Sequence, residues 1–163
     1  MKSFSNFILL FLLASSCLAQ PNLKDVLKEL NTESVPYITV DSLLTLKKIV
    51  LLDAREPKEF NVSHIKNAVF VCYTNFKPKK VLQQIPNKNT PIVIYCSIGV
   101  RSEDIAERLL KKGYTNVTNL YGGIFEWKKK NQPVYDKDNK ATNKVHAFDK
   151  FWGKLLTNAE KVY

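Results

Sequence analysis

The chain has 163 residues, of which 45% are hydrophobic and 25% charged, and its basic residues outnumber its acidic residues by 25 to 15. This length suits one domain that can fold unaided, and the composition excludes a disordered chain. The lysines lie in small groups, at 47–48, 79–80, 111–112 and 128–130, which is typical of a solvated surface. We therefore expect no nucleic acid as a partner, and we expect the charge to provide solubility and to attract small anions.

Residues 1–19 have the pattern of a secretory signal peptide. Lys2 precedes an apolar run over 7–14, and small residues follow as far as Ala19. The run is too short to span a bilayer, so we expect no membrane span. Cleavage after Ala19 would release an exported protein, periplasmic or secreted. The alternative is a tethered lipoprotein with a lipid anchor on Cys17, but the large aliphatic residue usual three positions before such a cysteine is missing.

After a helical lead-in over 20–35, short strands alternate with helices. Apolar spacing predicts an opening helix over 22–30, then a small strand and a helical turn capped by Asp41 or Ser42. Strands are predicted at 37–40, 48–53, 69–72, 92–95 and 114–120. Helices are predicted at 56–60, 77–85, 102–112 and 124–130. This alternation predicts an α/β fold, with a parallel sheet covered by helices on both faces.

A C-terminal extension follows the alternating part of the chain, over 136–163. Its first residues, 136–144, have the composition of a linker. Aromatic and leucine residues then recur at helical spacing over 145–163, which predicts a helix packed on the domain.

The strand at 92–95 ends at Cys96, and a loop containing Gly99 leads from it into a helix. The free amides and the dipole at a helix start favour an anion, and Gly99 can adopt angles that curl the amides of 97–101 around the sulfur. With Arg101 nearby, the thiol should ionise below the value of ~8.5 for free cysteine. Cys96 is therefore the candidate nucleophile, and a buried cysteine that only packs is the alternative.

Parallel sheets bind ligands outside the carboxyl ends of their strands, which places the loops after Asp53, Cys72, Cys96 and Leu120 at one edge. We expect Cys96 to be free and Cys72 to be buried at the end of a fully buried strand, although the spacing alone leaves a disulfide open. Neither histidine has a metal-ligand partner at a usable spacing, so we expect no metal.

Three motifs in order resemble those of the rhodanese homology domain, over about 36–135. They are Leu52-Asp53-Ala54-Arg55-Glu56 followed by Glu59-Phe60, His64-Ile65 and Ala68; Cys96-Ser97-Ile98-Gly99-Val100-Arg101-Ser102; and Leu120-Tyr121-Gly122-Gly123-Ile124 with Trp127 and Pro133-Val134. Ser63 and Asn67 replace glycines that are usual in that family. The resemblance implies a parallel rhodanese-like sheet.

The resemblance also implies a sulfurtransferase without a cofactor, and we expect the protein to be a monomer. Cys96 would take sulfur from a small anionic donor such as thiosulfate, or from a persulfide, and pass it to cyanide or a thiol. The donor would be held by Arg101, Ser97, Ile98, Gly99, Val100 and Arg55. Asp53 would support the site by accepting backbone hydrogen bonds, and Ser102 would support the loop. For Arg55 the alternative is an ion pair with Asp53 or Glu56 that braces the loop.

Two other activities compete with sulfur transfer. A cysteine phosphatase or arsenate reductase of the same fold has one residue more between its cysteine and its arginine, whereas four residues separate Cys96 from Arg101. The shorter loop suits a sulfur atom better than a phosphate. A thiol redox or sulfur-carrier protein would instead use Cys72 to resolve an oxidised Cys96, which requires the two sulfurs to come within disulfide reach.

Overall fold

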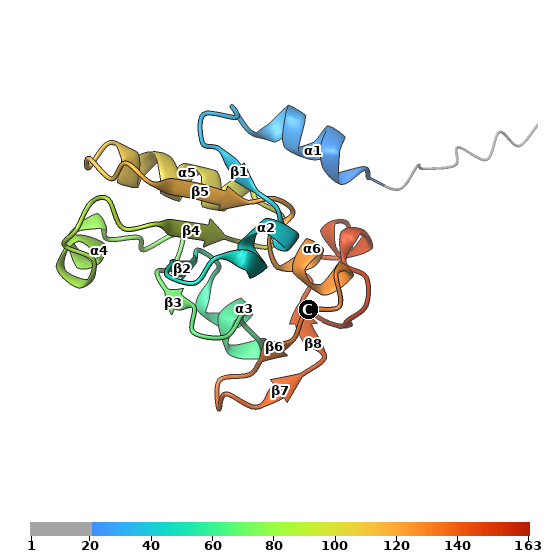
Figure 1. Cartoon of the computed structure of the whole chain (residues 1–163). Helices are drawn as coiled ribbons and strands as arrows, with labels where there is room; N and C mark the ends of the chain where they lie inside the picture. The colour runs from blue at the N-terminus through green and yellow to red at the C-terminus, as the bar shows by residue number, and fades with distance from the viewer. Residues whose placement is uncertain (1–20) are drawn as a thin grey trace, which may run out of the picture.

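A computed structural model describes residues 21–163, so the predicted signal peptide and the alternative lipid site at Cys17 lie outside the described residues. Its centre is a parallel sheet of five strands in the order β1-β5-β4-β2-β3 (Figure 1). The strands are β1 (Tyr37–Ile38), β2 (Val50–Asp53), β3 (Val69–Phe70), β4 (Ile92–Tyr95) and β5 (Val117–Leu120). The predicted α/β fold with a parallel sheet is confirmed.

Successive residues of the central strands point to opposite faces of this sheet, and each face has its own apolar core. Leu51 and Val93 belong to the core that includes Ile124 of helix α6 (Gly123–Lys129), whereas Leu52 and Ile94 belong to the core that includes Ile105 of helix α5 (Val100–Leu110). The helices are α1 (Leu23–Leu30), α2 (Val40–Thr45), α3 (Pro57–Val62), α4 (Pro78–Gln84), α5 (Val100–Leu110) and α6 (Gly123–Lys129). Both faces of the sheet are therefore covered by helices, as predicted.

Two helices begin two residues or more from their predicted positions. Thr39 is the N-cap of α2, because its hydroxyl oxygen accepts the Ser42 backbone N–H at 3.1 Å, so the prediction of Asp41 or Ser42 was wrong. Helix α5 begins at Val100, two residues before the predicted start, after Gly99 with φ of 113°. Arg101 therefore lies in the first turn of α5.

The third strand is shorter and more exposed than predicted. β3 pairs only with β2 at the edge of the sheet, and Phe70 keeps 36% of its surface exposed. The apolar run at 69–72 is therefore not the fully buried strand that was expected, since an edge strand has a neighbour on one side only. Cys72 lies beyond the end of β3, buried, with a positive φ of 57°.

The C-terminal extension is not the predicted helix. After the antiparallel pair β6 (Val134–Tyr135) and β7 (Ala141–Thr142), the chain forms the parallel pair β8 (Lys144–His146) and β9 (Glu160–Val162). Between β8 and β9 it makes only a short 3₁₀ turn, η1 (Trp152–Leu155). Phe148, with φ of 68°, interrupts any helix before that turn.

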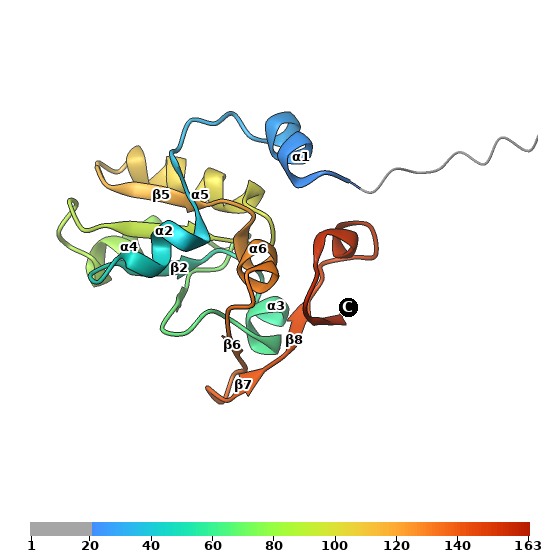
Figure 2. The same ribbon diagram turned by 45° about the vertical axis from the view of Figure 1, so that its right-hand side comes forward.

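The extension nevertheless packs on the domain. Val145, Ala147 and Leu156 are buried in the same core as Ile124, and β8 packs against α3. Figure 2 shows this segment, coloured red, standing beside α3 and α6. The apolar residues that suggested a helix are therefore used by strands and turns that cover the same core.

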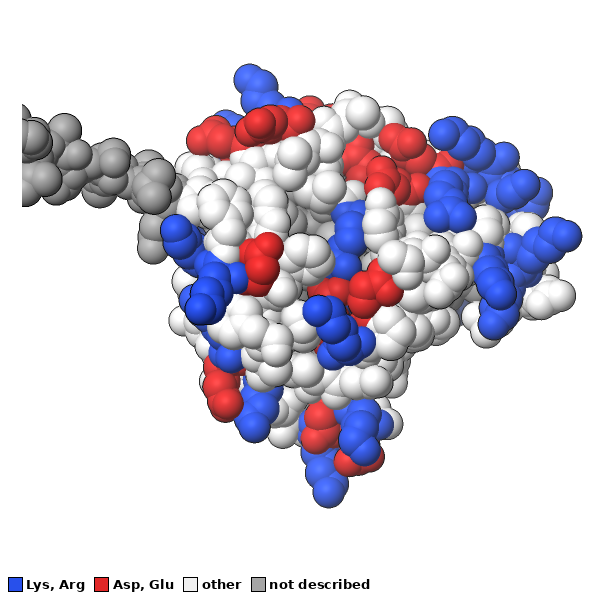
Figure 3. Space-filling view, turned by 180° about the vertical axis from the view of Figure 1, so that it is seen from behind, with Lys and Arg blue, Asp and Glu red and all other residues white. Residues whose placement is uncertain are grey.

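The charged side chains are spread over the surface in separate groups. On the face seen in Figure 3, basic residues gather at the end where α4 lies, and acidic residues lie between the other basic groups. Among residues 21–163, no helix is long and apolar enough to cross a membrane.

Helix α6 is attached to the Cys96 loop by its own N-terminus. The Ile124 N–H donates to the Cys96 carbonyl oxygen at 3.0 Å, and the Phe125 N–H donates to the Ser97 carbonyl oxygen at 3.1 Å. Such a close approach requires glycine at position 123, because a Cβ there would overlap the Cys96 carbonyl and lie 2.8 Å from the Ser97 oxygen. The φ of 52° at Gly123 adds a second reason.

We predict that Gly123→Ala lowers the free energy of unfolding by about 2–5 kcal/mol, because overpacking and an unfavourable positive φ both contribute. Urea denaturation followed by circular dichroism would measure the loss. Gly113→Ala is the matched control, since its φ is also positive, at 87°, but its Cβ would meet only the flexible Lys88 side chain. Equal losses in the two variants would contradict the close-approach argument.

Candidate active site

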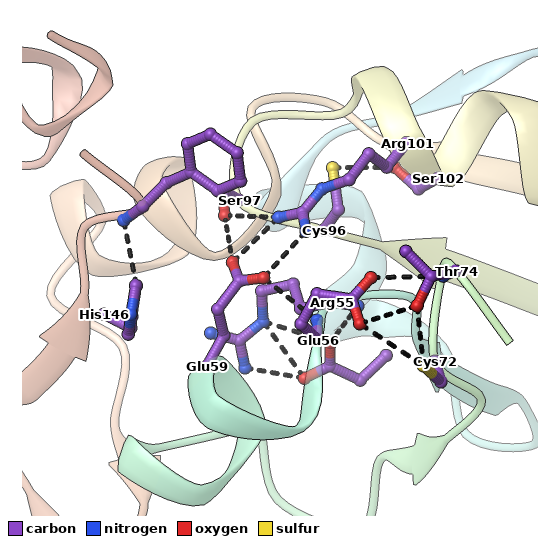
Figure 4. Close-up of polar contacts among 12 residues, drawn as sticks. Arg55, Glu56, Glu59, Cys72, Thr74, Cys96, Ser97, Arg101, Ser102 and His146 are labelled. Atoms are coloured by element: carbon purple, nitrogen blue, oxygen red, sulfur yellow. Dashed lines mark hydrogen bonds and ion pairs between the residues drawn. The ribbon is translucent and has the colours of Figure 1, made fainter. Parts of the chain in front are cut away.

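Cys96 lies at the carboxyl end of β4, and only 1% of its surface is exposed. Its Sγ accepts the Gly99 backbone N–H at 3.2 Å and lies 3.5 Å from the Ser102 hydroxyl (Figure 4). Burial by itself raises the pKa of the Cys96 thiol, but the charge of Arg101 and the hydrogen bonds from Ser102 and Gly99 outweigh it, so that the pKa lies below its ordinary value. The site therefore favours the thiolate, which is the nucleophilic form.

The loop keeps its shape through the Gly99 peptide. The Gly99 carbonyl oxygen accepts the side-chain amide of Asn119 at 2.7 Å and that of Asn31 at 3.0 Å. The Asn119 oxygen in turn accepts the Ser102 hydroxyl at 2.7 Å. These bonds fix the peptide between Gly99 and Val100, which directly follows the peptide whose N–H donates to the Cys96 sulfur.

Arg101 is paired with a glutamate that the sequence analysis did not select. Both terminal nitrogens of Arg101 donate to the Glu59 carboxylate, at 2.7 and 2.8 Å. Ser97 joins the cluster, because its hydroxyl donates to Glu59 and accepts from Arg101, each at 3.0 Å. Figure 4 shows Glu59 of α3 pointing toward Arg101 of α5. The pair joins two helices that are far apart in sequence.

Glu59 is wholly buried. Burial raises the pKa of its carboxyl, but hydrogen bonds and charge from Arg101 lower it to about 2. The sequence did contain one signal, because Glu59 stands at the third helical position after Glu56 and accepts the Glu56 backbone N–H at 2.9 Å, as in a capping box. That signal predicts a helix cap, whereas the partnership with Arg101 depends on the tertiary fold.

Arg55 does not line the site as a donor-binding residue. It is fully buried, and its guanidinium forms a two-pronged ion pair with Asp53, with Nη2 2.6 Å from the carboxylate. Nη2 also donates to the Ser63 carbonyl oxygen at 2.6 Å. This corrects the expectation that Arg55 holds an anion, since the alternative ion pair with Asp53 uses that charge. Asp53 also accepts the Arg55 backbone N–H at 3.0 Å, at the strand end where that contact was expected.

A cavity of about 170 Å³ lies over Cys96. It is lined by Leu30, Cys96, Ser97, Ile98, Val100, Arg101, Phe148 and Trp152. Gly99 is not part of the lining and contributes only its backbone to the site. Leu30 of α1 and the two aromatic residues of the C-terminal extension were not predicted, because nothing in the local sequence places these distant segments at the cysteine loop.

The second cysteine has different surroundings. Cys72 is also free, and its Sγ lies 3.5 Å from a Glu56 carboxylate oxygen. It lines a separate cavity together with Phe70 and Lys77. Among the described residues, no group of three or more His, Cys, Asp or Glu side chains is arranged to hold a metal ion.

Comparison with known proteins identifies the family. The model of the rhodanese-like domain matches residues 39–130, which is more than half of the chain, so the chain belongs to the rhodanese-like domain family. The chain is 33% identical over 87 residues to the probable adenylyltransferase/sulfurtransferase MoeZ of Mycobacterium tuberculosis, covering 53% of this chain and 22% of that protein. It is 33% identical over 119 residues to a tRNA uridine(34) hydroxylase of Buchnera aphidicola, covering 65% of this chain and 37% of that protein.

Other similar proteins are of single-domain size or share the fold. The chain is 25% identical over 96 residues to the thiosulfate sulfurtransferase GlpE of Coxiella burnetii, covering 59% of this chain and 87% of that protein. A thiosulfate sulfurtransferase from Pseudomonas aeruginosa superposes with a TM-score of 0.59 at 22% identity, covering 70% of this chain and 22% of that one. A rhodanese-like domain from Anabaena superposes with a TM-score of 0.55 at 20% identity, covering 62% of this chain and 79% of that one.

We predict that Glu59→Gln lowers the free energy of unfolding by about 2–4 kcal/mol at pH 7, because Arg101 loses its charged partner in a mostly buried position. Since the pKa of Glu59 is lowered from 4.5 to about 2 on folding, its contribution is complete above pH 4.5 and is lost as the pH falls toward 2. The difference between wild type and variant should therefore shrink over that range, as measured by urea denaturation at several pH values.

The control is Glu160→Gln, which removes an exposed glutamate paired with Lys144. It should leave the pH dependence of stability unchanged. A Glu59→Gln difference that stays constant down to pH 2 would contradict the assignment of a low pKa to this carboxyl.

We further predict that Arg101→Gln raises the pKa of the Cys96 thiol, because the thiolate loses the nearby positive charge. The rate of alkylation by iodoacetamide as a function of pH would measure this in a Cys72→Ser background. Arg108→Gln is the matched control, since Arg108 lies on the same helix but contacts Phe76. An unchanged midpoint in Arg101→Gln would refute the electrostatic role of Arg101.

Proposed function

We propose that the protein is a sulfurtransferase that carries sulfur on Cys96 as a persulfide. The observation that carries the proposal is the Cys96 thiol, whose pKa is lowered and whose sulfur accepts the Gly99 N–H at the base of a cavity. A thiolate in this position is a nucleophile, and the fixed N–H groups also suit a persulfide anion. No proton acceptor is required once the thiolate has formed.

The transfer proceeds in two steps. The Cys96 thiolate attacks the outer sulfur of the donor, the sulfur–sulfur bond of the donor breaks, and its electron pair leaves with the remainder of the donor. An acceptor such as cyanide or a thiolate then attacks the outer sulfur of the persulfide, and the electron pair of that bond returns to Cys96. Sulfite leaves when thiosulfate is the donor, and thiocyanate forms when cyanide is the acceptor.

The relatives support this class of reaction. Two of the three curated proteins reported above carry sulfurtransferase in their names, and one of these, GlpE, is matched over 87% of its length. The residues of this chain give further support, because the loop contains the cysteine, the glycine and the arginine.

The competing activities have less support. Cys72 lines a different cavity from Cys96, which does not favour a redox pair between the two sulfurs. For a phosphatase, the arginine after the cysteine would have to bind a phosphate dianion, yet both terminal nitrogens of Arg101 are occupied by Glu59. Sulfur transfer needs no such free arginine.

We also propose that the protein is exported, on the basis of the signal-like pattern over residues 1–19. Fractionation of cells that produce the full chain would recover it outside the cytoplasm. N-terminal analysis would distinguish cleavage after Ala19 from a lipid on Cys17. Recovery of uncleaved protein in the cytoplasm would refute this part of the proposal.

We predict that incubation with thiosulfate, or with an organic thiosulfonate, adds one sulfur atom to the protein. Intact-mass spectrometry would detect the adduct, and added cyanide should remove it as thiocyanate. Cys96→Ser should show no adduct, whereas Cys72→Ser should behave as the wild type. The absence of an adduct on the wild type with every donor, or its presence on Cys96→Ser, would refute the proposed function. Hydrolysis of a phosphate ester would support the phosphatase instead.

A further inference from the structure

We propose that the preferred sulfur donor is an organic sulfane-sulfur compound with an apolar group and at most one negative charge, because an ion-paired arginine and an apolar rim lie together over Cys96. This inference rests on the proposed sulfur transfer and specifies its substrate class. The inorganic dianion thiosulfate would be the poorer substrate.

The charge at the base of the cavity opposes a dianion. Arg101 is the one cation among the described residues that line it, and its terminal nitrogens bind the Glu59 carboxylate. The Cys96 thiolate adds a second negative charge beside this pair, so that the reactive site has a net negative charge. The next arginine, Arg55, is neutralised by Asp53 behind the loop. A dianion therefore meets repulsion that a monoanion or a neutral compound largely avoids.

The mouth of the cavity is mostly apolar. Five of the eight lining residues are apolar: Leu30, Ile98, Val100, Phe148 and Trp152. Leu30 and Phe148 keep 48% and 42% of their surface exposed. Apolar side chains that remain exposed around a cavity are typical of a surface that binds an apolar ligand. The remainder of the donor, beyond its outer sulfur, would lie against these side chains.

The two aromatic residues that line the cavity are held in position by the backbone around them. The Phe148 backbone N–H donates to His146 Nδ1 at 3.0 Å, and its ring lies 5.0 Å from the Arg101 guanidinium. The Asp149 carboxylate accepts the Phe151 and Trp152 backbone N–H groups, both at 2.8 Å. The extension therefore presents Phe148 and Trp152 to the cavity in a defined arrangement, beside the arginine and above the sulfur.

For an organic thiosulfonate, the reaction is balanced without a further reagent. The Cys96 thiolate attacks the outer sulfur, a Cys96 persulfide anion forms, and the broken sulfur–sulfur bond leaves its electron pair on an organic sulfinate. The thiolate and the thiosulfonate together carry two negative charges, and so do the persulfide anion and the sulfinate. The sulfinate is a monoanion, whereas thiosulfate would release sulfite as a dianion at the same negative site.

The test compares three donors with the wild-type protein: thiosulfate, methanethiosulfonate and benzenethiosulfonate. Thiocyanate formation with cyanide gives kcat/KM, and each value is divided by the rate of the same donor with a small thiol in solution, which removes differences in intrinsic reactivity. We expect the order benzenethiosulfonate, methanethiosulfonate, thiosulfate, with about a tenfold or greater difference between the first and the last. An equal or higher normalised value for thiosulfate would overturn the inference.

Two variants test the apolar rim. Phe148→Ala and Trp152→Ala should lower kcat/KM for benzenethiosulfonate by about tenfold and change the values for the other two donors by less than about twofold. Leu44→Ala removes an equally exposed apolar side chain, 51% exposed and outside the cavity lining, and should change none of the three. Equal losses for all three donors in the Phe148 and Trp152 variants would also overturn the inference.

A third variant tests the charge. Glu59→Gln leaves Arg101 without its negative partner, so that kcat/KM for thiosulfate should rise several-fold relative to methanethiosulfonate. The ratio is used because a change in the reactivity of Cys96 affects both donors alike. A folded variant with an unchanged ratio would count against the charge argument. Failure of the proposed function is distinguishable, because no sulfur would then be transferred from any of the three donors.

Discussion

The ion pair between Arg101 and Glu59 is the interaction on which the site depends. It connects α3 to the first turn of α5, the helix that directly follows the cysteine loop. The arginine charge lowers the pKa of the Cys96 thiol, and the glutamate keeps that arginine at a fixed place. One pair of side chains therefore sets both the position and the reactivity of the sulfur. It also limits the positive charge that remains for a substrate.

Much of the fold could be predicted from local patterns. The alternation of apolar strands with amphipathic helices is a local property, and it gave the parallel sheet and the edge at which Cys96 lies. The end of β4 at Cys96 and the need for a glycine in the following loop could be predicted for the same reason. The start of α5 was placed two residues too late, because the apolar spacing begins only after the residues that form the first turn of the helix.

The errors arise where tertiary contacts override local spacing. The aromatic residues over 145–163 recur at helical intervals, yet Phe148 adopts a positive φ and the segment forms β8, η1 and β9 against the core. Both Arg55 and Arg101 were expected to hold the donor, with an ion pair to Asp53 or Glu56 as the alternative for Arg55. The fold decides between these two possibilities, because Arg55 is buried in its pair with Asp53 and Arg101 lines the cavity. Glu59 has the local environment of a helix cap, so its role beside the loop depends on its tertiary contact with Arg101 of α5.

The attachment of α6 to the back of the cysteine loop has a consequence for the divergence of this site. Two carbonyl groups of the loop, those of Cys96 and Ser97, are engaged by the amides of α6, with Gly123 in direct contact. On its other side the loop is fixed at Gly99 by Asn31 and Asn119. An insertion between these anchors would displace either the helix or the Gly99 peptide. A single inserted residue is therefore not sufficient to give a longer loop with a wider anion site. The contact between α6 and the loop would have to change at the same time.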